Sequence, residues 1–518
     1  MLRWFRRLRY AVENGYEPEA MPWKRGDLAA AVVLTATMWS VWCTLFSRAQ
    51  DRVLTLKCAE NYAVAVYDQL LWNFTTTGAW SQKIHFGYQD AWDWSGHLAL
   101  WIFPIAGLYA LWPGPNTLLG VQTAAVVLGA VPMYFLGRRA FAAGGDGSVI
   151  GGLVAALGFL AWPALWGVAL ADYQDLVIGV PFLIGAYAAS QRGSAVGMMV
   201  LGLLTCAARE EWLFLVPFVP LAAPGGVREK LRQAAVLGLG LVPYAMFLVE
   251  ARLHGTQSPH AVQPGIGQGA VEQGVALFLN RGVPLERFMQ WPPPFTRSAV
   301  DVRWFYAQFL EPLGWLALFS PSVALPAAIA WFMHACSPPE GGVDARWVGH
   351  IHHMAPINAF LGVGATLGAA RLLRGARRLW ERGLVAGIVG GVLTTGLVAL
   401  VLGAALDTRG VLPWLQLHPR FTPTATASPA PEWALLQANV PADAAIATDP
   451  HGSLLISTRA DAYTYNESLA EKSRNRNLSA LDYVLVRRTD TEWLGHVRGW
   501  SKARKIGETA EYELYALR

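Results

Sequence analysis

Up to about residue 406, long apolar runs alternate with short charged connectors. Several runs reach the roughly 20 residues that a helix needs to cross the hydrocarbon core of a bilayer. We expect about eleven spans, because 197–223 and 305–335 each divide into two short helices, at Arg209-Glu210-Glu211 and at Ser320-Pro321. The apolar runs are 27–47, 118–136, 149–170, 176–190, 197–223, 234–249, 305–335, 354–370 and 384–406.

Lysine and arginine residues gather beside one end of these runs. When successive spans alternate in direction, every basic connector falls on the same side; these connectors are 3–25, 138–139, 192, 228–232 and 371–382. Cytoplasmic loops carry such an excess of Lys and Arg, so we expect a multispan protein of the cytoplasmic (inner) membrane with its N-terminus in the cytoplasm. The outer side then holds three loops, at about 48–116, 252–303 and 337–353, and residues 97–112 form an interfacial or re-entrant helix.

The last part of the chain returns to the composition of a soluble protein. After a linker at 407–431, short strand patterns at 444–448, 483–487 and 512–516 alternate with helical patterns at 432–439 and just upstream of Ala510. This alternation predicts a small α/β domain at 432–518, outside the cytoplasm. The predicted fold class is therefore an all-α transmembrane bundle at 27–406, with interfacial helices in its outer loops, a basic cytoplasmic segment at 1–26 and a small C-terminal α/β domain.

Composition narrows the classes of partner. The chain is 54% hydrophobic and 15% charged, against about 25% charged residues in soluble domains. Its net charge of +5 comes from the connectors beside the spans, which indicates membrane lipids and not nucleic acid as the partner. Four cysteines without CxxC spacing provide no metal or redox framework. Cys58 and Cys336 both fall in outer segments, and whether they pair stays open.

Five groups of ionisable residues lie at the same expected outer level. Charges beside spans are expensive to bury, so they indicate a functional site by default. An arginine binds phosphate bidentately, and a carboxylate in a half-apolar cleft has a raised pKa that suits a general base. The groups are Glu60 with Asp68, His97, Asp172 with Asp175, Arg209-Glu210-Glu211, and His350 with His352 and His353.

Each group also has a purely structural interpretation. Asp68 suits a solvated position on an amphipathic outer helix, and His97 suits a helix cap. Asp172 and Asp175 suit a helix N-terminus, where the dipole favours carboxylates. The three charges at 209–211 suit internal ion pairing. The histidines at 350–353 suit a divalent metal with a carboxylate, but their spacing is not a strong ligand signature, so a metal cofactor stays open.

Six stretches, in this order along almost the whole chain, resemble a bacterial and archaeal family of multispan membrane proteins of unknown function. That family is grouped with the C-type glycosyltransferase (GT-C) superfamily. The stretches are YDQLLWNF at 67–74, GHLALWIFPIAGLYALWPGPNTLLGVQ at 96–122, DYQDLVIGVP at 172–181, REEWLFLV at 209–216, HHMAP at 352–356 and LDYVLV at 481–486.

The resemblance implies an enzyme that transfers a sugar from a polyprenyl-phosphate donor outside the cytoplasmic membrane. In the superfamily, a carboxylate in the first outer loop deprotonates the acceptor and basic residues hold the lipid phosphate. Carried onto this chain, Asp68 is the candidate base and Arg209 the candidate phosphate ligand, with Asp172 and Glu210 as second carboxylates. His97, Asp175, His352 and His353 complete the candidate substrate-binding residues. The resemblance identifies neither the sugar nor the acceptor.

The chain departs from the family pattern before the Tyr-Asp-Gln triplet. Ala63 stands where the family carries an acidic residue, so the base is Asp68 or Glu60, or the chain is an inactive relative with a binding role. Gln174 stands where histidine is frequent, and Arg209 replaces a lysine, which keeps the charge but changes the geometry. The rival from another class is a lipid or solute transporter. Transporters usually carry paired discontinuous helices in two related halves, and the sequence has no such halves.

Overall fold

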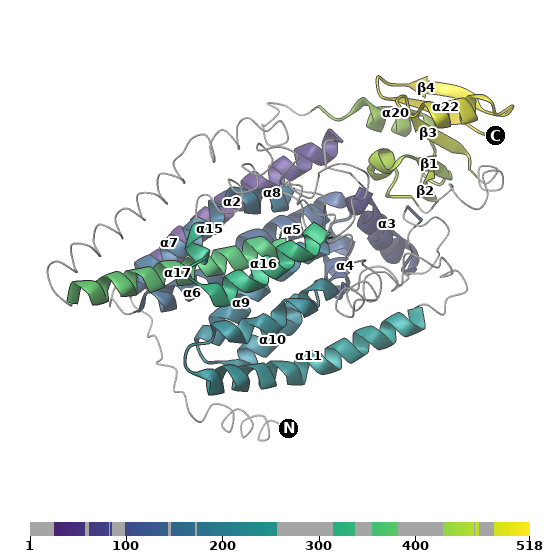
Figure 1. The fold of residues 1–518 in the computed structure, drawn as a ribbon. Helices are drawn as coiled ribbons and strands as arrows, with labels where there is room; N and C mark the ends of the chain where they lie inside the picture. Colours follow the sequence, from purple (N-terminus) through teal and green to yellow (C-terminus); the bar gives the residue numbers. More distant parts are fainter. Residues whose placement is uncertain are drawn as a thin grey trace.

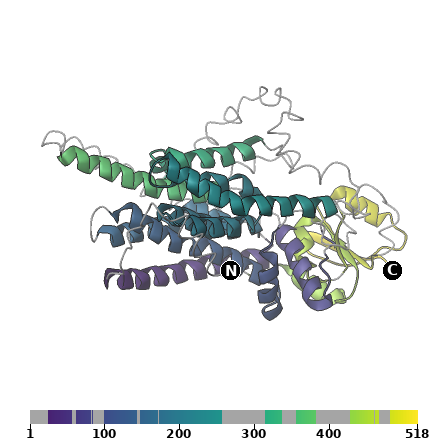
Figure 2. The same ribbon diagram turned by 90° about the horizontal axis from the view of Figure 1, so that it is seen from below.

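In the computed structural model, helices form an elongated bundle with a small sheet domain at one end (Figures 1 and 2). Helix α3 (Tyr62–Thr77) lies between the bundle and this sheet domain in both views. The structure describes residues 25–56, 62–81, 83–84, 99–142, 147–170, 173–255, 314–336, 355–381, 428–459, 461–465 and 481–518.

Within these residues, four helical segments are long and apolar enough to cross a membrane. They belong to α2 (Arg25–Leu54), α5 with α6 (Pro115–Leu128 and Ala130–Ala140), α11 (Val227–Gly255) and α17 (Ala355–Glu381). The membrane bundle predicted from the sequence is thus present, but its expected total of about eleven spans is not confirmed. The run at 384–406 lies outside the described residues.

The remaining apolar helices are shorter, and prolines account for several of their limits. The single span predicted at 149–170 is interrupted, because Pro163 disfavours helical geometry at Trp162 before it. The predicted break at Ser320-Pro321 is present, with Pro321 as the first residue of its helix. These helices are α4 (Ile102–Leu111), α7 (Gly147–Leu160), α8 (Pro163–Leu170), α9 (Gly179–Gln191), α10 (Ala195–Cys206), α15 (Gly314–Ala317) and α16 (Pro321–Cys336).

The break predicted within 197–223 is also present, although its second half is not an α-helix. Helix α10 ends at Cys206, and the 3₁₀ segments η3 (Glu210–Phe214) and η4 (Val216–Ala222) follow. Pro217 and Pro220 lack the backbone N–H that an α-helix would use there. Between α10 and η3, the chain is extended at Arg209, where φ is −166°.

Glycines bring two bundle helices into close contact. A Cβ on Gly137 of α6 would lie 2.5 Å from the Ala155 Cβ of α7, and one on Gly152 would lie 2.8 Å from the Tyr134 ring. Small residues at such crossings allow helix backbones to approach without hydrocarbon side chains between them.

The C-terminal domain is a five-stranded mixed sheet with helices, in the strand order β2-β1-β3-β5-β4. Strand β1 runs parallel to β2 and β3, whereas β5 runs antiparallel to β3 and β4. Its elements are α20 (Pro431–Asn439), β1 (Ile446–Thr448), η8 (Pro450–Leu455), β2 (Ala462–Thr464), β3 (Tyr483–Arg487), α22 (Thr491–Arg498), β4 (Arg504–Glu508) and β5 (Tyr512–Ala516).

The prediction of a helix just upstream of Ala510 is wrong. Residues 504–508 form strand β4, which pairs with β5 across a tight connection. Strand pairing with a neighbour outweighs the weak local preference of such a charged segment. The three predicted strands and the helix at 432–439 are present.

A buried ion pair joins α2 to α6 at the end of the bundle opposite the sheet domain. Asp27 Oδ2 lies 3.0 Å from Arg138 Nη2, and the Tyr134 hydroxyl donates a 2.6 Å hydrogen bond to Asp27 Oδ1. Asp27 is 1% exposed and Arg138 is 4% exposed. Loss of one partner would leave the other charge buried without its main counter-ion.

We therefore expect Asp27→Asn to lower the free energy of unfolding by about 3–5 kcal/mol, the usual cost of breaking a buried pair. Thermal unfolding of the purified protein in detergent measures the effect. The control is Asp51→Asn on the same helix, at a half-buried position, which should leave the midpoint nearly unchanged. Equal midpoints for the two variants would contradict the structural role of the pair.

Candidate functional site

Helix α3 presents three consecutive polar residues, Tyr67, Asp68 and Gln69, to different neighbours. Successive side chains on an α-helix diverge by about 100°, so these three cannot share one partner. Tyr67 contacts Asp175 in the turn that precedes α9. Asp68 contacts α4 and the C-terminal domain. Gln69 binds the backbone of Arg459 in the C-terminal domain and of Ile84, which follows α3 in the chain. Two polar groups result, one beside Tyr67 and one beside Asp68.

The first group centres on Asp175, which opens the 3₁₀ segment η2 (Asp175–Ile178). The Tyr67 hydroxyl donates to Asp175 Oδ2 at 2.6 Å, and the Leu176 N–H donates to Oδ1 at 2.7 Å. Arg209 Nη1 lies 3.5 Å from the same Oδ1. Asp175 is 1% exposed, so this carboxylate is held by its partners and not by water.

Arg209 brings the η3 segment into this group. Its Nη1 donates to Gln174 Oε1 at 3.0 Å, and its Nη2 lies 3.2 Å from Glu211 Oε1. The Arg209 side chain is 3% exposed, whereas that of Glu211 is 28% exposed. Glu211 is therefore the partner of this guanidinium that solvent reaches.

Backbone packing explains why these two segments meet. Gly179 follows η2, and a Cβ at this position would overlap the Trp212 indole of η3. The Trp212 Nε1–H donates to the Leu176 carbonyl at 3.1 Å. From α5, Gln122 Oε1 accepts the Gln174 N–H at 2.7 Å, which fixes the residue before Asp175.

Several carboxylates lie around the Arg209 guanidinium. Asp175, Glu210 and Glu211 all act electrostatically on one guanidinium, that of Arg209. Among the described residues, no set of three or more His, Cys, Asp or Glu side chains is arranged to hold a metal ion. Arg209 is thus engaged by acids before any ligand arrives.

The second group surrounds Asp68, which is 0% exposed. The Tyr109 hydroxyl of α4 donates to Asp68 Oδ1 at 2.7 Å, and the Ser457 hydroxyl of the C-terminal domain donates to Oδ2 at 2.7 Å. Burial raises the pKa of Asp68 to about 6, although both hydrogen bonds oppose that rise. The structural alternative for Asp68, a solvated position on an outer helix, is therefore wrong, because two hydroxyl groups replace water around its carboxylate.

Further contacts fix the C-terminal domain against α3. The Gln69 amide donates to the Arg459 carbonyl at 3.0 Å, and its Oε1 accepts the Lys83 N–H at 2.6 Å. Lys83 Nζ pairs with Asp461 Oδ1 at 2.8 Å, and the Thr464 hydroxyl donates to the Ile84 carbonyl at 2.6 Å. Asp68 thus lies beneath an intramolecular interface.

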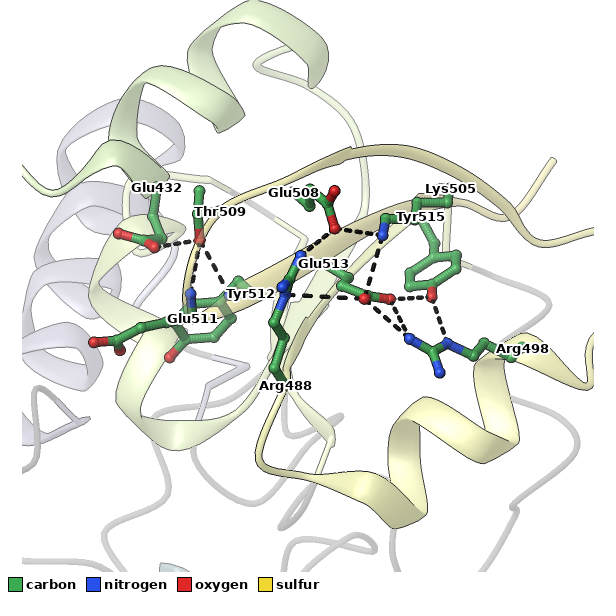
Figure 3. A network of polar contacts seen from close by, with 10 residues as sticks. All are labelled: Glu432, Arg488, Arg498, Lys505, Glu508, Thr509, Glu511, Tyr512, Glu513 and Tyr515. Carbon is green, nitrogen blue, oxygen red and sulfur yellow. Dashed lines mark hydrogen bonds and ion pairs between the residues drawn. The ribbon is translucent and has the colours of Figure 1, made fainter.

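A separate polar network on the sheet domain surrounds Glu513 of β5 (Figure 3). Arg498 Nη2 lies 3.0 Å from both carboxylate oxygens, Lys505 Nζ lies 3.2 Å from Oε1, and the Tyr515 hydroxyl donates to Oε2. Burial alone would raise the pKa of Glu513, but the hydrogen bonds from Tyr515, Arg498 and Lys505 lower it to about 2. This network cross-links α22, β4 and β5 and shares no residue with the two groups beside α3.

The structure brings together only part of the site predicted from the sequence. Asp175, Arg209 and Glu210 join one group, while Asp68 faces a different set of partners. The other predicted residues lie outside the described part of the chain: Glu60, His97, Asp172, His352 and His353, together with Cys58 of the open Cys58–Cys336 pairing.

Sequence reasoning missed four contacting residues. Tyr67 and Gln122 carry no charge and lie in apolar segments, although Tyr67 precedes Asp68 directly. Tyr109 belongs to a strongly apolar short helix. Ser457 is separated from Asp68 by 389 positions, and no local pattern relates the two.

Comparisons with known proteins agree with this architecture. Residues 55–276 match a family model described as "Predicted membrane protein (DUF2079)". No curated protein matches the chain.

Three solved structures are similar. ArnT from Cupriavidus metallidurans in the apo state is 12% identical, over 95% of this chain and 98% of that chain, with a TM-score of 0.54. The same protein bound to undecaprenyl phosphate is 11% identical, over 94% and 98%, with a TM-score of 0.52. The apo oligosaccharyltransferase of Archaeoglobus fulgidus is 11% identical, over 93% and 74%, with a TM-score of 0.41. The match to ArnT shows a GT-C-like fold, so the expected resemblance to a GT-C-like membrane family of unknown function is confirmed.

Variants of two neighbouring tyrosines, Tyr67 and Tyr173, test the hydrogen bond from Tyr67 to Asp175. The Tyr67 and Tyr173 rings pack edge-to-face with centroids 5.0 Å apart. Tyr67→Phe removes a bond to a carboxylate and should lower stability by about 1.5–3 kcal/mol. Tyr173→Phe is the matched control, because the buried Tyr173 hydroxyl has no hydrogen-bond partner among the described residues, and it should be neutral or stabilising. Thermal unfolding in detergent compares the two variants. A Tyr67→Phe variant that is more stable than Tyr173→Phe would contradict the stabilising role of the hydrogen bond from Tyr67 to Asp175.

The Glu513 network predicts a pH dependence. Because the pKa of Glu513 is lowered to about 2, its contribution is fully present above the pKa of about 4.3 in an unfolded chain. It is lost as pH falls through about 2. Glu513→Gln should therefore speed hydrogen exchange of the β5 amides at pH 7. The difference in exchange rate between this variant and the unmutated protein should become smaller below pH 4. If this difference in exchange rate stays constant with pH, after correction for intrinsic exchange rates, ionisation of Glu513 does not contribute to the stability of β5.

Proposed function

We propose that this multispan membrane protein with a GT-C-like fold transfers a sugar from a polyprenyl-phosphate donor at the outer face of the cytoplasmic membrane. One observation carries the proposal: adjacent residues of α3 contact a buried carboxylate–guanidinium group on one side and supply a buried carboxylate of raised pKa on the other. Transfer from a lipid phosphate requires both a base and a cation. The fold likeness to ArnT supports this by analogy only, because a fold does not specify a reaction.

Asp68 is our candidate for the general base. Its pKa of about 6 lies close to neutral pH, where a base combines ionisation with useful basicity. Among the described residues, only burial and the hydroxyl groups of Tyr109 and Ser457 contribute to that shift. Glu60 remains the second candidate.

Arg209 is our candidate ligand for the donor phosphate. Its charge is already engaged by Asp175 and Glu211, so phosphate must replace one of them. Glu211 is the partner that solvent reaches, whereas Asp175 is almost fully buried. The donor phosphate would therefore displace Glu211 from Nη2, while Asp175 and Gln174 keep the guanidinium oriented. Glu210, His97, Asp172, His352 and His353 remain proposed substrate-binding residues around this position.

The proposed reaction is a direct displacement at the anomeric carbon. The acceptor transfers a proton to Asp68 as its nucleophilic atom forms a bond to that carbon. The bond from the carbon to the phosphate oxygen breaks, and polyprenyl phosphate leaves with the electron pair. Arg209 stabilises the charge that develops on this leaving group. The positions of the basic connectors support a cytoplasmic N-terminus and a C-terminal domain outside the membrane.

Loss of the base should abolish turnover without loss of fold. With purified protein in proteoliposomes and a labelled polyprenyl-phosphate sugar, we expect Asp68→Asn to lower kcat by about 10²–10⁴-fold. Asp443→Asn, at an exposed site of the C-terminal domain, is the control and should retain full activity. Undetectable turnover in the unmutated protein, or unchanged turnover in Asp68→Asn, would defeat the proposal.

The Arg209 variants separate phosphate binding from ion pairing. Arg209→Gln should raise the KM for the donor by about tenfold or more, equivalent to about 1.4 kcal/mol. Glu211→Gln should lower this KM, because the neutral amide competes less with phosphate. A raised KM in Glu211→Gln would contradict the displacement of Glu211. Vesicle flux of the lipid that collapses in Arg209→Gln, with no chemical turnover, would favour a transporter.

A further inference from the structure

The partner of Asp68 from the C-terminal domain is a hydroxyl group. Ser457 donates to Asp68 Oδ2 at 2.7 Å while it also lies 3.0 Å from the Leu454 carbonyl at the end of η8. Ser457 is 1% exposed and Asp68 is 0% exposed. A small alcohol thus already occupies the hydrogen-bonding position that a substrate of this carboxylate would need.

The two donors to Asp68 differ in how they are attached. Tyr109 belongs to α4, which packs on α3 within the bundle, whereas Ser457 follows η8, which packs on α3 from the C-terminal domain. Ser457 comes from the C-terminal domain, 389 positions away in the chain. If that domain separated from α3, Asp68 would keep Tyr109 on Oδ1 and lose the donor on Oδ2. The vacated side would be an opening in which a second hydroxyl group can bind.

The polar contacts that hold the domain there include a weak and accessible one. The side chains of Lys83 and Asp461 are 21% and 43% exposed, and exposed ion pairs contribute only about 0–1 kcal/mol. Further polar contacts among the described residues are hydrogen bonds from Gln69 and Thr464 to backbone atoms, and one from the Ala430 N–H to the Leu54 carbonyl. The interface also contains apolar contacts, because Leu454, Leu455 and Ile456 share one buried core with residues of α3. Opening of the domain would therefore expose part of that core.

We infer that the space now filled by the Ser457 hydroxyl, between Asp68 and the C-terminal domain, is the binding subsite for the acceptor's alcohol group, and that the C-terminal domain must lift off α3 to admit it. This inference rests on the proposed glycosyl transfer and identifies its acceptor class as a hydroxyl compound. The serine side chain is a primary alcohol, so a hydroxymethyl group fits the same contacts. The acceptor replaces Ser457, transfers its proton to Asp68 and attacks the donor.

The closed arrangement also explains how water is kept from the base. With Ser457 in place, Asp68 is out of contact with solvent, so water cannot be deprotonated to attack the donor. Entry of the acceptor would then couple opening of the domain to reaction with an alcohol instead of hydrolysis.

Opening is measured first, by thiol labelling. Ser457→Cys is introduced into the full-length chain in which Cys43, Cys58, Cys206 and Cys336 are replaced by serine, and the protein is reconstituted in proteoliposomes. We expect slow reaction with a maleimide, at least tenfold faster reaction when Asp461→Lys is added, and slow reaction again in the charge swap Lys83→Glu with Asp461→Lys. Equal labelling rates in all three backgrounds would overturn the inferred opening.

Turnover then tests the subsite. Ser457→Ala removes the competing hydroxyl and should lower the KM for an alcohol acceptor severalfold while kcat is retained. A thiol-reactive linker across Lys83→Cys and Asp461→Cys should abolish transfer, and its cleavage should restore it. Undiminished transfer in the linked protein, or an unchanged acceptor KM in Ser457→Ala, would overturn the inference. If the unmutated protein transfers no sugar, the proposed function fails, whereas the labelling rates still decide whether the domain opens.

Discussion

The contact between the helical bundle and the C-terminal domain depends on one buried carboxylate, that of Asp68, whose partners among the described residues are uncharged. Removing an ionised carboxylate from water costs several kcal/mol even after relaxation, and hydrogen bonds from neutral hydroxyl groups offset only part of this cost. Asp68 therefore has a raised pKa, and its neighbours must supply donors from both sides. Tyr109 and Ser457 do so. This requirement ties the bundle and the C-terminal domain to the same helix.

Helix α3 extends this link in two further directions. One residue before Asp68, Tyr67 contacts the Asp175–Arg209 group; one residue after it, Gln69 binds backbone atoms near Lys83 and in the C-terminal domain. A movement of α3 or of the domain would therefore affect both polar groups. A base and a cation that serve one reaction need such mechanical coupling, because their relative position determines the rate.

Local signals in the sequence predicted much of the fold. The length of the apolar runs predicted the helical bundle. Pro321 predicted the start of α16, and the charges at 209–211 predicted the interruption after α10. Alternating patterns predicted three strands of the terminal sheet. Strand β4 was missed because its pairing with β5, and not its own composition, determines its conformation. The break at Trp162 follows from Pro163, a signal that the length of the apolar run concealed.

The candidate site was less accessible to sequence reasoning. Charge identified Asp175, Arg209 and Glu210, which do meet. Charge also suggested that Asp68 belongs in the same cavity, but the pitch of α3 turns it toward other partners. Ser457 and Tyr109 carry no charge, and their contacts join segments that are distant in the chain. Only tertiary structure reveals such neutral donors.

Side-specific labelling of single cysteines tests most directly whether α3 and the C-terminal domain share the outer face. Thr76→Cys on α3, Lys502→Cys on the domain and Arg371→Cys on α17 all replace exposed residues. In intact cells, a membrane-impermeant maleimide should label the first two positions and should reach the third only after the membrane is permeabilised. Protection of either of the first two positions until permeabilisation would place them in the cytoplasm and contradict a lipid-linked reaction outside it.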